Sequence, residues 1–424
     1  MNLEDFKHQI KSSSEKFRRL QCSESLEPPY TKRKHYLCSG WNSVQTFRPA
    51  FYSKPNPSKH LISHMHHILF RTHMRPFATT LATLALAVAG TMPSAAISRQ
   101  RPAKSATTVK AYQRGLQSIS MEAAKAHVFF LADNLLEGRR AGQRGSRIAQ
   151  QYIVAQMRQL GLQPLPGHDF LIPFEAYSRA QVHREGRYWV EADSVKSISQ
   201  SPYHLKLSLS NTLAWIPGKR TDEFVVVGAH LDHEGMNPDL DGDQIYNGAD
   251  DNASGVSAAL QIMRAFAVSG VKPERSVVFA FWDGEEFGLL GSRHFAETST
   301  IMPQVKGYLN FDMVGGNNKP SDPQQFVYFF TESHPALGQW LKDDIARHKL
   351  ALHPDYHPWD NPVGGSDQST FAKKGVPIVW YHTDAQPHYN HPSDEAPTLN
   401  YEKLTDITRA SFLTLWHMAN EPAF

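Results

Sequence analysis

The sequence contains very few cysteines and little excess of charge of either sign. Only two of its 424 residues are cysteines, Cys22 and Cys38, and none follows Cys38. Neither disulfide bonds nor thiol chemistry can therefore support a domain built from the later residues. Hydrophobic residues make up 41% of the chain and charged residues 20%, which is typical of a globular protein and argues against a polytopic membrane fold.

The charge is distributed unevenly along the chain. Residues 1–96 contain 13 Lys/Arg and 5 Asp/Glu, whereas the remaining residues contain 31 and 36. The later part is therefore mildly acidic, which gives no electrostatic reason to expect a nucleic-acid partner. Residues 1–73 mix polar, basic and His-rich stretches with prolines and show no sustained hydrophobic period. We expect them to be a disordered upstream extension.

The next segment has the three parts of a secretory signal peptide in order. Met74-Arg75-Pro76 leads into the apolar run 77–90, and the small residues of 94–96 follow where a signal peptidase would cut. The apolar run is short and rich in Ala and Thr, so it is poorly suited to spanning a bilayer. We therefore expect a signal peptide over 74–96, a translation start at Met74 and an exported product, periplasmic or secreted, without stable membrane insertion after cleavage. A buried helix of the mature fold is the alternative interpretation.

The remainder is predicted to be a flexible lead-in over 97–118 and one α/β domain over 119–424. Two helical patterns, 119–137 and 146–160, precede short strands and turns over 167–220. Apolar runs of strand length then alternate with helical patterns, which predicts a mostly parallel, doubly wound mixed sheet with helices on both faces. The expected strands are 224–229, 276–282, 307–311, 326–330 and 376–381, and the expected helices are 253–267, 287–297, 335–348 and 401–419.

Histidine and carboxylate residues follow several of these predicted strands. Ligand sites of open α/β sheets form just beyond the carboxyl ends of the strands, so these side chains should meet at one edge. Imidazole and carboxylate groups without a thiolate suit zinc in a hydrolytic role. The residues concerned are His230, Asp232 and His233, then Asp250 and Asp251, Asp283, Glu285 and Glu286, Asp312, and finally His382, His388 and His391.

Each of these residues has a simpler explanation when it is considered alone. A histidine after a strand is more often structural than a ligand, a Glu-Glu pair is commonly a solvated loop, and Asp312 could cap a turn. Together they are harder to explain without a cation, because burying so many carboxylates at one edge carries a large desolvation cost. The set therefore predicts a metal site.

Four long motifs resemble one enzyme family. GAHLDH at 228–233, GADDNASG at 248–255, WDGEEFGLLGS at 282–292 and NFDMVG at 310–315 resemble the secreted co-catalytic zinc aminopeptidases. This family includes bacterial leucyl aminopeptidases and aminopeptidases S and Y, and it is related to glutamate carboxypeptidase and glutaminyl cyclase. The stretch FLADNLLEGR at 130–139 is similar to the N-terminal helix of the family. The resemblance covers nearly all of residues 119–419.

The resemblance implies two zinc ions per chain and assigns a role to each motif residue. It makes His230 a ligand of one zinc and Glu286 a ligand of the other, with Asp251 bridging both. Asp312 would complete the first site. Glu285 would be the general base rather than a ligand, and Asp232 would lie behind His230 and fix its tautomer.

The last ligand is where the sequence departs from the family pattern, which has Tyr-His followed by an acidic residue four positions after the His. If Asp394 is that acidic residue, the ligand position falls on Asn390, which is a poor zinc ligand. If Glu395 takes the role, the position falls on His391. The prediction is His391, with His388 in reserve.

The expected function is hydrolysis of the N-terminal bond of peptides that have a free N-terminus. A zinc-bridged hydroxide would attack the scissile carbonyl, Glu285 would accept its proton and deliver it to the leaving amine, and Tyr389 would polarise the carbonyl. Three alternatives remain open on the same fold: a glutaminyl-cyclase-like acyltransferase with one zinc, a zinc carboxypeptidase and a non-catalytic binding homologue.

Overall fold

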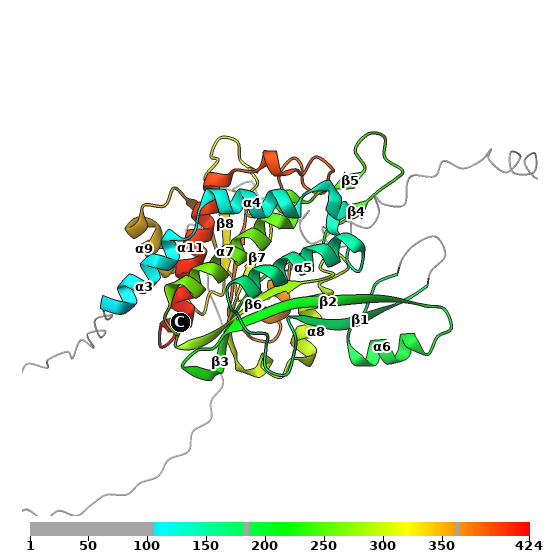
Figure 1. Cartoon of the computed structure of the whole chain (residues 1–424), viewed down its shortest axis with the longest axis horizontal. Helices are drawn as coiled ribbons and strands as arrows, with labels where there is room; N and C mark the ends of the chain where they lie inside the picture. The colour runs from blue at the N-terminus through cyan, green and yellow to red at the C-terminus, as the bar shows by residue number, and fades with distance from the viewer. Residues whose placement is uncertain (1–105, 181–185, 361–363) are drawn as a thin grey trace, which may run out of the picture. The chain divides into compact units, whose positions relative to one another are not determined.

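The computed structural model describes residues 106–180, 186–360 and 364–424 (Figure 1). The predicted upstream extension and signal peptide lie outside these residues. Part of the predicted flexible lead-in is instead a helix, α3 (Ala106–Gln117), in which Ala111 is fully buried and the Arg114 guanidinium donates to the Ser269 carbonyl. Packing against the domain gives this segment the tertiary support that its own polar sequence did not reveal. No helix in the described ranges is long and apolar enough to cross a membrane.

An eight-stranded mixed sheet forms the centre of the domain (Figure 1). The pairs β3–β6, β3–β7, β7–β10 and β8–β9 are parallel, and β1–β2, β2–β6 and β8–β10 are antiparallel. This confirms the predicted fold class. In spatial order the strands are β1 (Leu171–Arg179), β2 (His204–Ile216), β6 (Arg275–Trp282), β3 (Arg220–His230), β7 (Val305–Phe311), β10 (Ile378–His382), β8 (Gln325–Phe330) and β9 (His353–Pro358).

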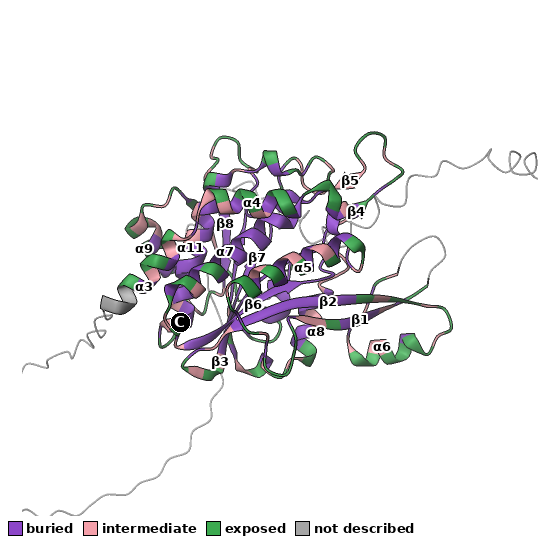
Figure 2. Cartoon of the chain, viewed as in Figure 1, coloured by how far each residue is buried: buried purple, intermediate pink, exposed green. Residues whose placement is uncertain are grey.

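Helices cover both faces of the sheet, so its central strands are buried on both sides (Figure 2). Val225 and Val227 of β3 belong to the larger core, whereas Phe224 and Val226 belong to the smaller one on the opposite face. This explains why the sequence of β3 is a continuous apolar run. The larger core includes α4 (Met121–Leu131), α5 (Arg144–Gln159), α7 (Gly255–Ser269), α9 (Ala336–His348) and α11 (Tyr401–Asn420), and the smaller one includes α8 (Leu290–Thr298) and α10 (Gln368–Ala372).

The structure differs from the predicted elements at three places. Helix α4 is capped by Ser120, as expected, but it ends at Leu131, and the short 3-10 helix η1 (Asn134–Arg139) follows it. Helix α6 (Ala192–Ser199) and strand β9 had no clear pattern in the sequence, because both are short and only partly buried. Strand β2 is one long strand rather than several short ones.

Helix η1 packs against a small hairpin formed by β4 (Gly235–Met236) and β5 (Ile245–Tyr246). The contact is so close that a Cβ atom on Gly138 would lie 2.3 Å from the Gly235 carbonyl oxygen. Gly138 is therefore required for this approach of backbone to backbone.

Candidate metal centre

The carboxyl ends of three neighbouring parallel strands bring the predicted ligands together. His230 is the last residue of β3 and is paired with Trp282, the last residue of β6. Asp312 directly follows β7, the other neighbour of β3. Asp251 comes from the distorted π-helical turn η2 (Ala249–Ser254), which leads into α7. The sequence folds this way because polar residues end the apolar strands at one common edge.

The first candidate metal group consists of His230, Asp251 and Asp312, as the sequence predicts for one site. His230 Nε2 lies 3.2 Å from Asp251 Oδ1 and 3.4 Å from Asp312 Oδ1. Ligand atoms about 2.1 Å from a tetrahedral zinc ion lie about 3.4 Å from one another. All three side chains are buried, so the group has both the spacing and the ligand chemistry of a zinc site.

The second candidate group consists of His233, Asp251 and Glu286. His233 Nδ1 lies 2.8 Å from Glu286 Oε1 and 3.8 Å from Asp251 Oδ2. Asp251 therefore offers one carboxylate oxygen to each group, which is the arrangement expected of a bridging ligand. His233 was among the histidines and carboxylates expected at this edge of the sheet, but it was given no role as a ligand.

The structure does not bring His391 or His388 to either group, so the prediction for the last ligand is corrected. His391 is exposed, and His388 bonds to the Ser393 hydroxyl instead. The reason is the buried carboxylate of Asp394, which accepts the backbone N–H groups of Asp250 and Asp251 and fixes the loop. Asp394 thus anchors the loop, as in the alternative alignment that places Asn390 at the family's ligand position.

Three carboxylates beside the candidate ligands hold neighbouring loops through backbone N–H groups. Asp394 holds the turn that carries Asp251, and Asp250 Oδ1 accepts the N–H groups of Gly315 and Gly316 beyond Asp312. Gly316 approaches so closely that a Cβ atom there would lie 2.2 Å from Asp250 Oδ2. Each ligand-bearing loop is therefore fixed by a charge-assisted hydrogen bond from another.

Asp232 has a broader role than the predicted one behind His230. Its carboxylate accepts the N–H groups of Glu285, at 3.0 Å, and Glu286, at 3.3 Å. His230 Nδ1 lies 3.1 Å from the backbone carbonyl oxygen of Asp232 and 3.9 Å from its carboxylate. The tautomer of His230 is therefore set mainly by a main-chain acceptor, while the Asp232 side chain positions the Glu-Glu pair.

The electrostatics of the cluster favour a bound cation. Burial lowers the pKa of His230, but Glu285, Asp312 and Asp251 raise it well above its usual value. Burial and Asp251 raise the pKa of Glu286 to about 7. The pKa values of both His230 and Glu286 are raised, so both side chains favour their protonated forms. This indicates an excess of buried negative charge, which a divalent metal would neutralise.

The predicted catalytic residues Glu285 and Tyr389 lie close to this charge. Burial raises the pKa of Glu285 well above its usual value, against the opposing effect of His230. Burial, Asp251 and Glu286 together raise the pKa of Tyr389, so its hydroxyl is protonated at neutral pH. Glu285 belongs to neither of the two metal groups.

Asp367 is a further acidic residue of this region that the sequence analysis missed. It is fully buried, and neither carboxylate oxygen has a hydrogen-bond partner. It precedes α10 but makes no cap bond, although Asp is a favoured N-cap residue. Burial raises its pKa to about 7, against the opposing effect of His230. Only the tertiary structure reveals this environment, because a sequence pattern cannot report burial of a loop residue.

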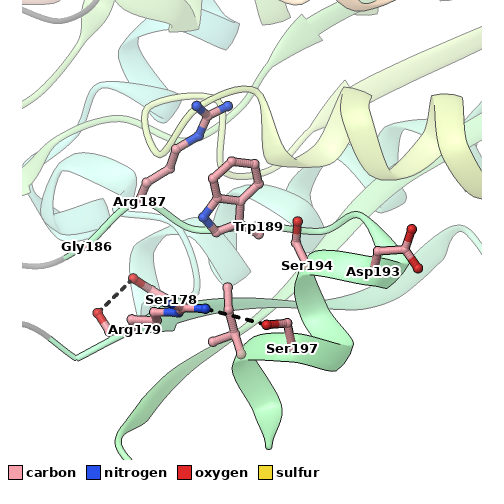
Figure 3. Close-up of a pocket in the computed structure, with 9 residues that line it drawn as sticks. Ser178, Arg179, Gly186, Arg187, Trp189, Asp193, Ser194 and Ser197 are labelled. Carbon is pink, nitrogen blue, oxygen red and sulfur yellow. Dashed lines mark hydrogen bonds between the residues drawn. The ribbon is translucent and has the colours of Figure 1, made fainter. Parts of the chain in front are cut away.

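Two hollows of the described surface are lined by residues outside the metal groups. Figure 3 shows one of about 550 Å³, in which Arg187 stacks on Trp189 beside Ser194 and Ser197 of α6. A second hollow, of about 570 Å³, lies over β1 and β2. Neither is lined by a candidate metal ligand. Converging ligands are a more specific sign of chemistry than volume, so we assign the functional site to the metal groups.

Known proteins match this chain in parts of the sequence and in the fold. Leupeptin-inactivating enzyme 1 of Streptomyces exfoliatus is 30% identical over 172 residues, which cover 40% of this chain and 34% of that protein. The LapA aminopeptidase of Legionella pneumophila superposes with a TM-score of 0.53 at 20% identity, covering 73% of this chain and 74% of that one. A glutaminyl cyclase of Fimbriiglobus ruber superposes with a TM-score of 0.53 at 16% identity, covering 70% and 95%.

The two structural matches establish the fold alone, because enzymes of both kinds share it. The chain spans between about a third and about a half of the length of the curated relatives that it matches. The model of peptidase family M28 matches residues 211–415, which include both metal groups. Over these residues the chain is similar to peptidase family M28.

Proposed function

We propose that this protein is a zinc-dependent aminopeptidase that binds two zinc ions and releases the N-terminal residue of peptides. The observation that carries the proposal is the position of Asp251, whose two oxygens face His230 on one side and His233 on the other. A shared carboxylate between two nitrogen ligands can hold two metal ions side by side. The match to the model of peptidase family M28 supports hydrolysis of peptide bonds as the reaction.

His230, Asp251 and Asp312 would hold one ion, and His233, Asp251 and Glu286 the other. When bound, the ions would lower the pKa of a water molecule and polarise the scissile carbonyl. Glu285 is the residue that accepts the proton of the attacking water and later passes it to the leaving amine. Its backbone is fixed by Asp232, which keeps the carboxylate in place for both transfers.

Tyr389 supplies a second polar group on the substrate side. Its raised pKa keeps the phenol protonated, so it can donate a hydrogen bond to the oxygen of the scissile carbonyl. Charge developing on that oxygen during attack would strengthen the bond. This role follows from the position of the loop that Asp394 anchors, and it does not require His391 to bind metal.

We also propose that the protein is exported from the cell interior. The signal-like segment 74–96 supports secretion or a periplasmic location, with the start of translation at Met74. Mass spectrometry of the native protein tests this point. Peptides from residues 1–73 in the product would contradict the proposed start, and an N-terminus near residue 97 would support it.

The central experiment is hydrolysis of leucine p-nitroanilide by the purified full chain, before and after chelation, with zinc counted per chain. Release of p-nitroaniline that needs two zinc ions per chain supports the proposal. Two bound zinc ions without release would contradict aminopeptidase activity and favour a carboxypeptidase. One zinc ion, with cyclisation of an N-terminal glutaminyl peptide, would favour the acyltransferase alternative.

A further inference from the structure

Arg139 is a buried cation that donates hydrogen bonds to the backbone next to the second metal group. Its side chain is 1% exposed. Nε donates to the Leu231 carbonyl at 2.9 Å and Nη2 to the Gly248 carbonyl at 2.9 Å. Nη1 donates to the carbonyls of Leu131, at 2.5 Å, and Asn247, at 2.6 Å. All four acceptors are main-chain oxygens, so the guanidinium fixes backbone segments rather than a single side chain.

These segments are the ones that carry His233 and Asp251. Leu231 lies two residues before His233, and Gly248 lies three residues before Asp251. In addition, the carbonyl oxygen of Arg139 accepts the backbone N–H of His233 at 3.2 Å. Arg139 therefore connects both residues through its side chain and holds His233 directly through its main chain.

The second metal group depends on this support more than the first. His230 is part of β3, and the next residue along, Leu231, donates its N–H to the Trp282 carbonyl at 2.8 Å. Asp312 follows β7 without a gap. The sheet thus positions His230 and Asp312, two of the three residues of the first group. His233 lies beyond the last residue of β3, where ladder hydrogen bonds no longer fix the backbone.

The backbone at Arg139 has a left-handed conformation that turns its side chain towards the interior. Glu137, Gly138 and Arg139 have consecutive positive φ angles of 50°, 64° and 49°. Left-handed backbone at non-glycine residues is costly and persists only where surrounding contacts impose it. The turn directs the guanidinium inward while its backbone remains beside the β4–β5 hairpin.

The positive charge of Arg139 lies among the carboxylates of the site. Burial lowers the pKa of Arg139 to about 10, against the opposing effects of Asp251, Asp394, Asp232 and Glu286, so the guanidinium remains protonated at neutral pH. A guanidinium offers five donors in a planar fork, whereas a lysine ammonium offers three from one point. Lysine would preserve the charge but could not span the same set of carbonyl oxygens.

We propose that Arg139 is a positioning residue that sets the separation of His233 and Asp251, and so selectively maintains the second metal site. This inference rests on the proposed two-metal function. The guanidinium donates to main-chain carbonyls, so it acts through the backbone that carries His233 and Asp251. Its loss should weaken binding of the second zinc ion while the first ion, on the strand ends, remains bound.

The test is stepwise zinc titration of the chelated full chain against a zinc-buffering dye, for the wild type, Arg139→Met and Arg139→Lys. Residues that orient metal ligands typically contribute roughly 10- to 100-fold to metal affinity. We expect both variants to bind the second zinc ion at least about tenfold more weakly, with the affinity for the first changed by less than about threefold.

Arg275→Met is the matched control. Arg275 is also buried and donates to the main-chain carbonyls of Met418, Glu421 and Pro422, but it begins β6 at the end opposite the metal groups. This variant should lower thermal stability and keep both zinc ions. It therefore measures the effect of losing a buried guanidinium without a role at the metal centre.

The outcomes separate the inference from the function on which it rests. A wild type that binds fewer than two zinc ions refutes the proposed function, and the inference with it. A wild type with two ions and Arg139 variants with unchanged affinities would overturn the inference alone. Equal weakening of both sites would also overturn it, because a purely structural role predicts no selectivity. If Arg139→Met does not fold, Arg139→Lys decides the question by the same criteria.

Discussion

Replacing His233 by phenylalanine tests the composition of the second metal site. The imidazole is fully buried, and its Nδ1 is the only nitrogen ligand that faces Glu286 and Asp251 in this group. Phenylalanine keeps a ring of similar size and removes the ligand atom. Because His233 Nε2 has no hydrogen-bond partner, no other polar contact of the ring is lost. The variant therefore isolates the contribution of Nδ1.

The expected magnitude follows from the number of ligands. Structural zinc sites with four ligands bind with about 10–16 kcal/mol, or about 2.5–4 kcal/mol for each ligand. A loss of that size corresponds to a roughly 10²- to 10³-fold weaker affinity. We therefore expect His233→Phe to bind one zinc ion tightly and the second at least about 10²-fold more weakly, with activity falling accordingly.

The assay is zinc titration of the chelated protein, combined with hydrolysis of leucine p-nitroanilide at each metal level. His391→Phe is the matched control, because it makes the same substitution at the exposed histidine that the sequence favoured. That control should keep both zinc affinities. If His233→Phe keeps two zinc ions and His391→Phe loses one, the assignment drawn from the structure is wrong.

Three further predictions concern the acidic residues of the site. Glu285→Gln should keep both zinc ions and lose roughly 10²- to 10⁴-fold in turnover; unchanged turnover would rule out the general-base role. Asp394→Asn should lower the free energy of unfolding by about 1.5–3 kcal/mol, because the carboxylate accepts the N–H of Asp251. Denaturant titration measures this loss, with the exposed substitution Ser393→Ala as the control. Burial raises the pKa of Asp367 to about 7, so its contribution to folding is lost as pH rises from about 4 to about 7. Zinc-free Asp367→Asn should therefore be more stable than the parent at pH 8, by up to about 4 kcal/mol, and not at pH 4; equal stability at pH 8 would contradict an unpartnered charge.

The prediction of the fold succeeded where burial leaves a clear pattern. Strands such as β3 and β6 are buried on both faces, so their apolar runs could be recognised without any tertiary information. Helix α3 was missed for the opposite reason, because most of its residues are polar and it is held by contacts with distant parts of the chain, such as Ser269. Its helical state depends on those contacts more than on its own sequence.

The sequence by itself determined the order of the strands and helices and the identity of four residues at the metal groups. The rule that parallel strands end at one edge brought the histidines and carboxylates together, and the resemblance to the zinc aminopeptidases selected His230, Asp251, Glu286 and Asp312 among them. Local pattern and topology carry this information, because each residue is fixed relative to a regular element.

Only the tertiary structure brought His233 into the second candidate group. Whether His391 or another residue completes the second group depends on which acidic residue anchors its loop, and Asp394 does so through the backbone of Asp250 and Asp251. The position of His233 likewise depends on Arg139, which is 94 residues away in the sequence. Irregular loops take their conformation from such distant hydrogen bonds, and for that reason a linear pattern could not place these side chains.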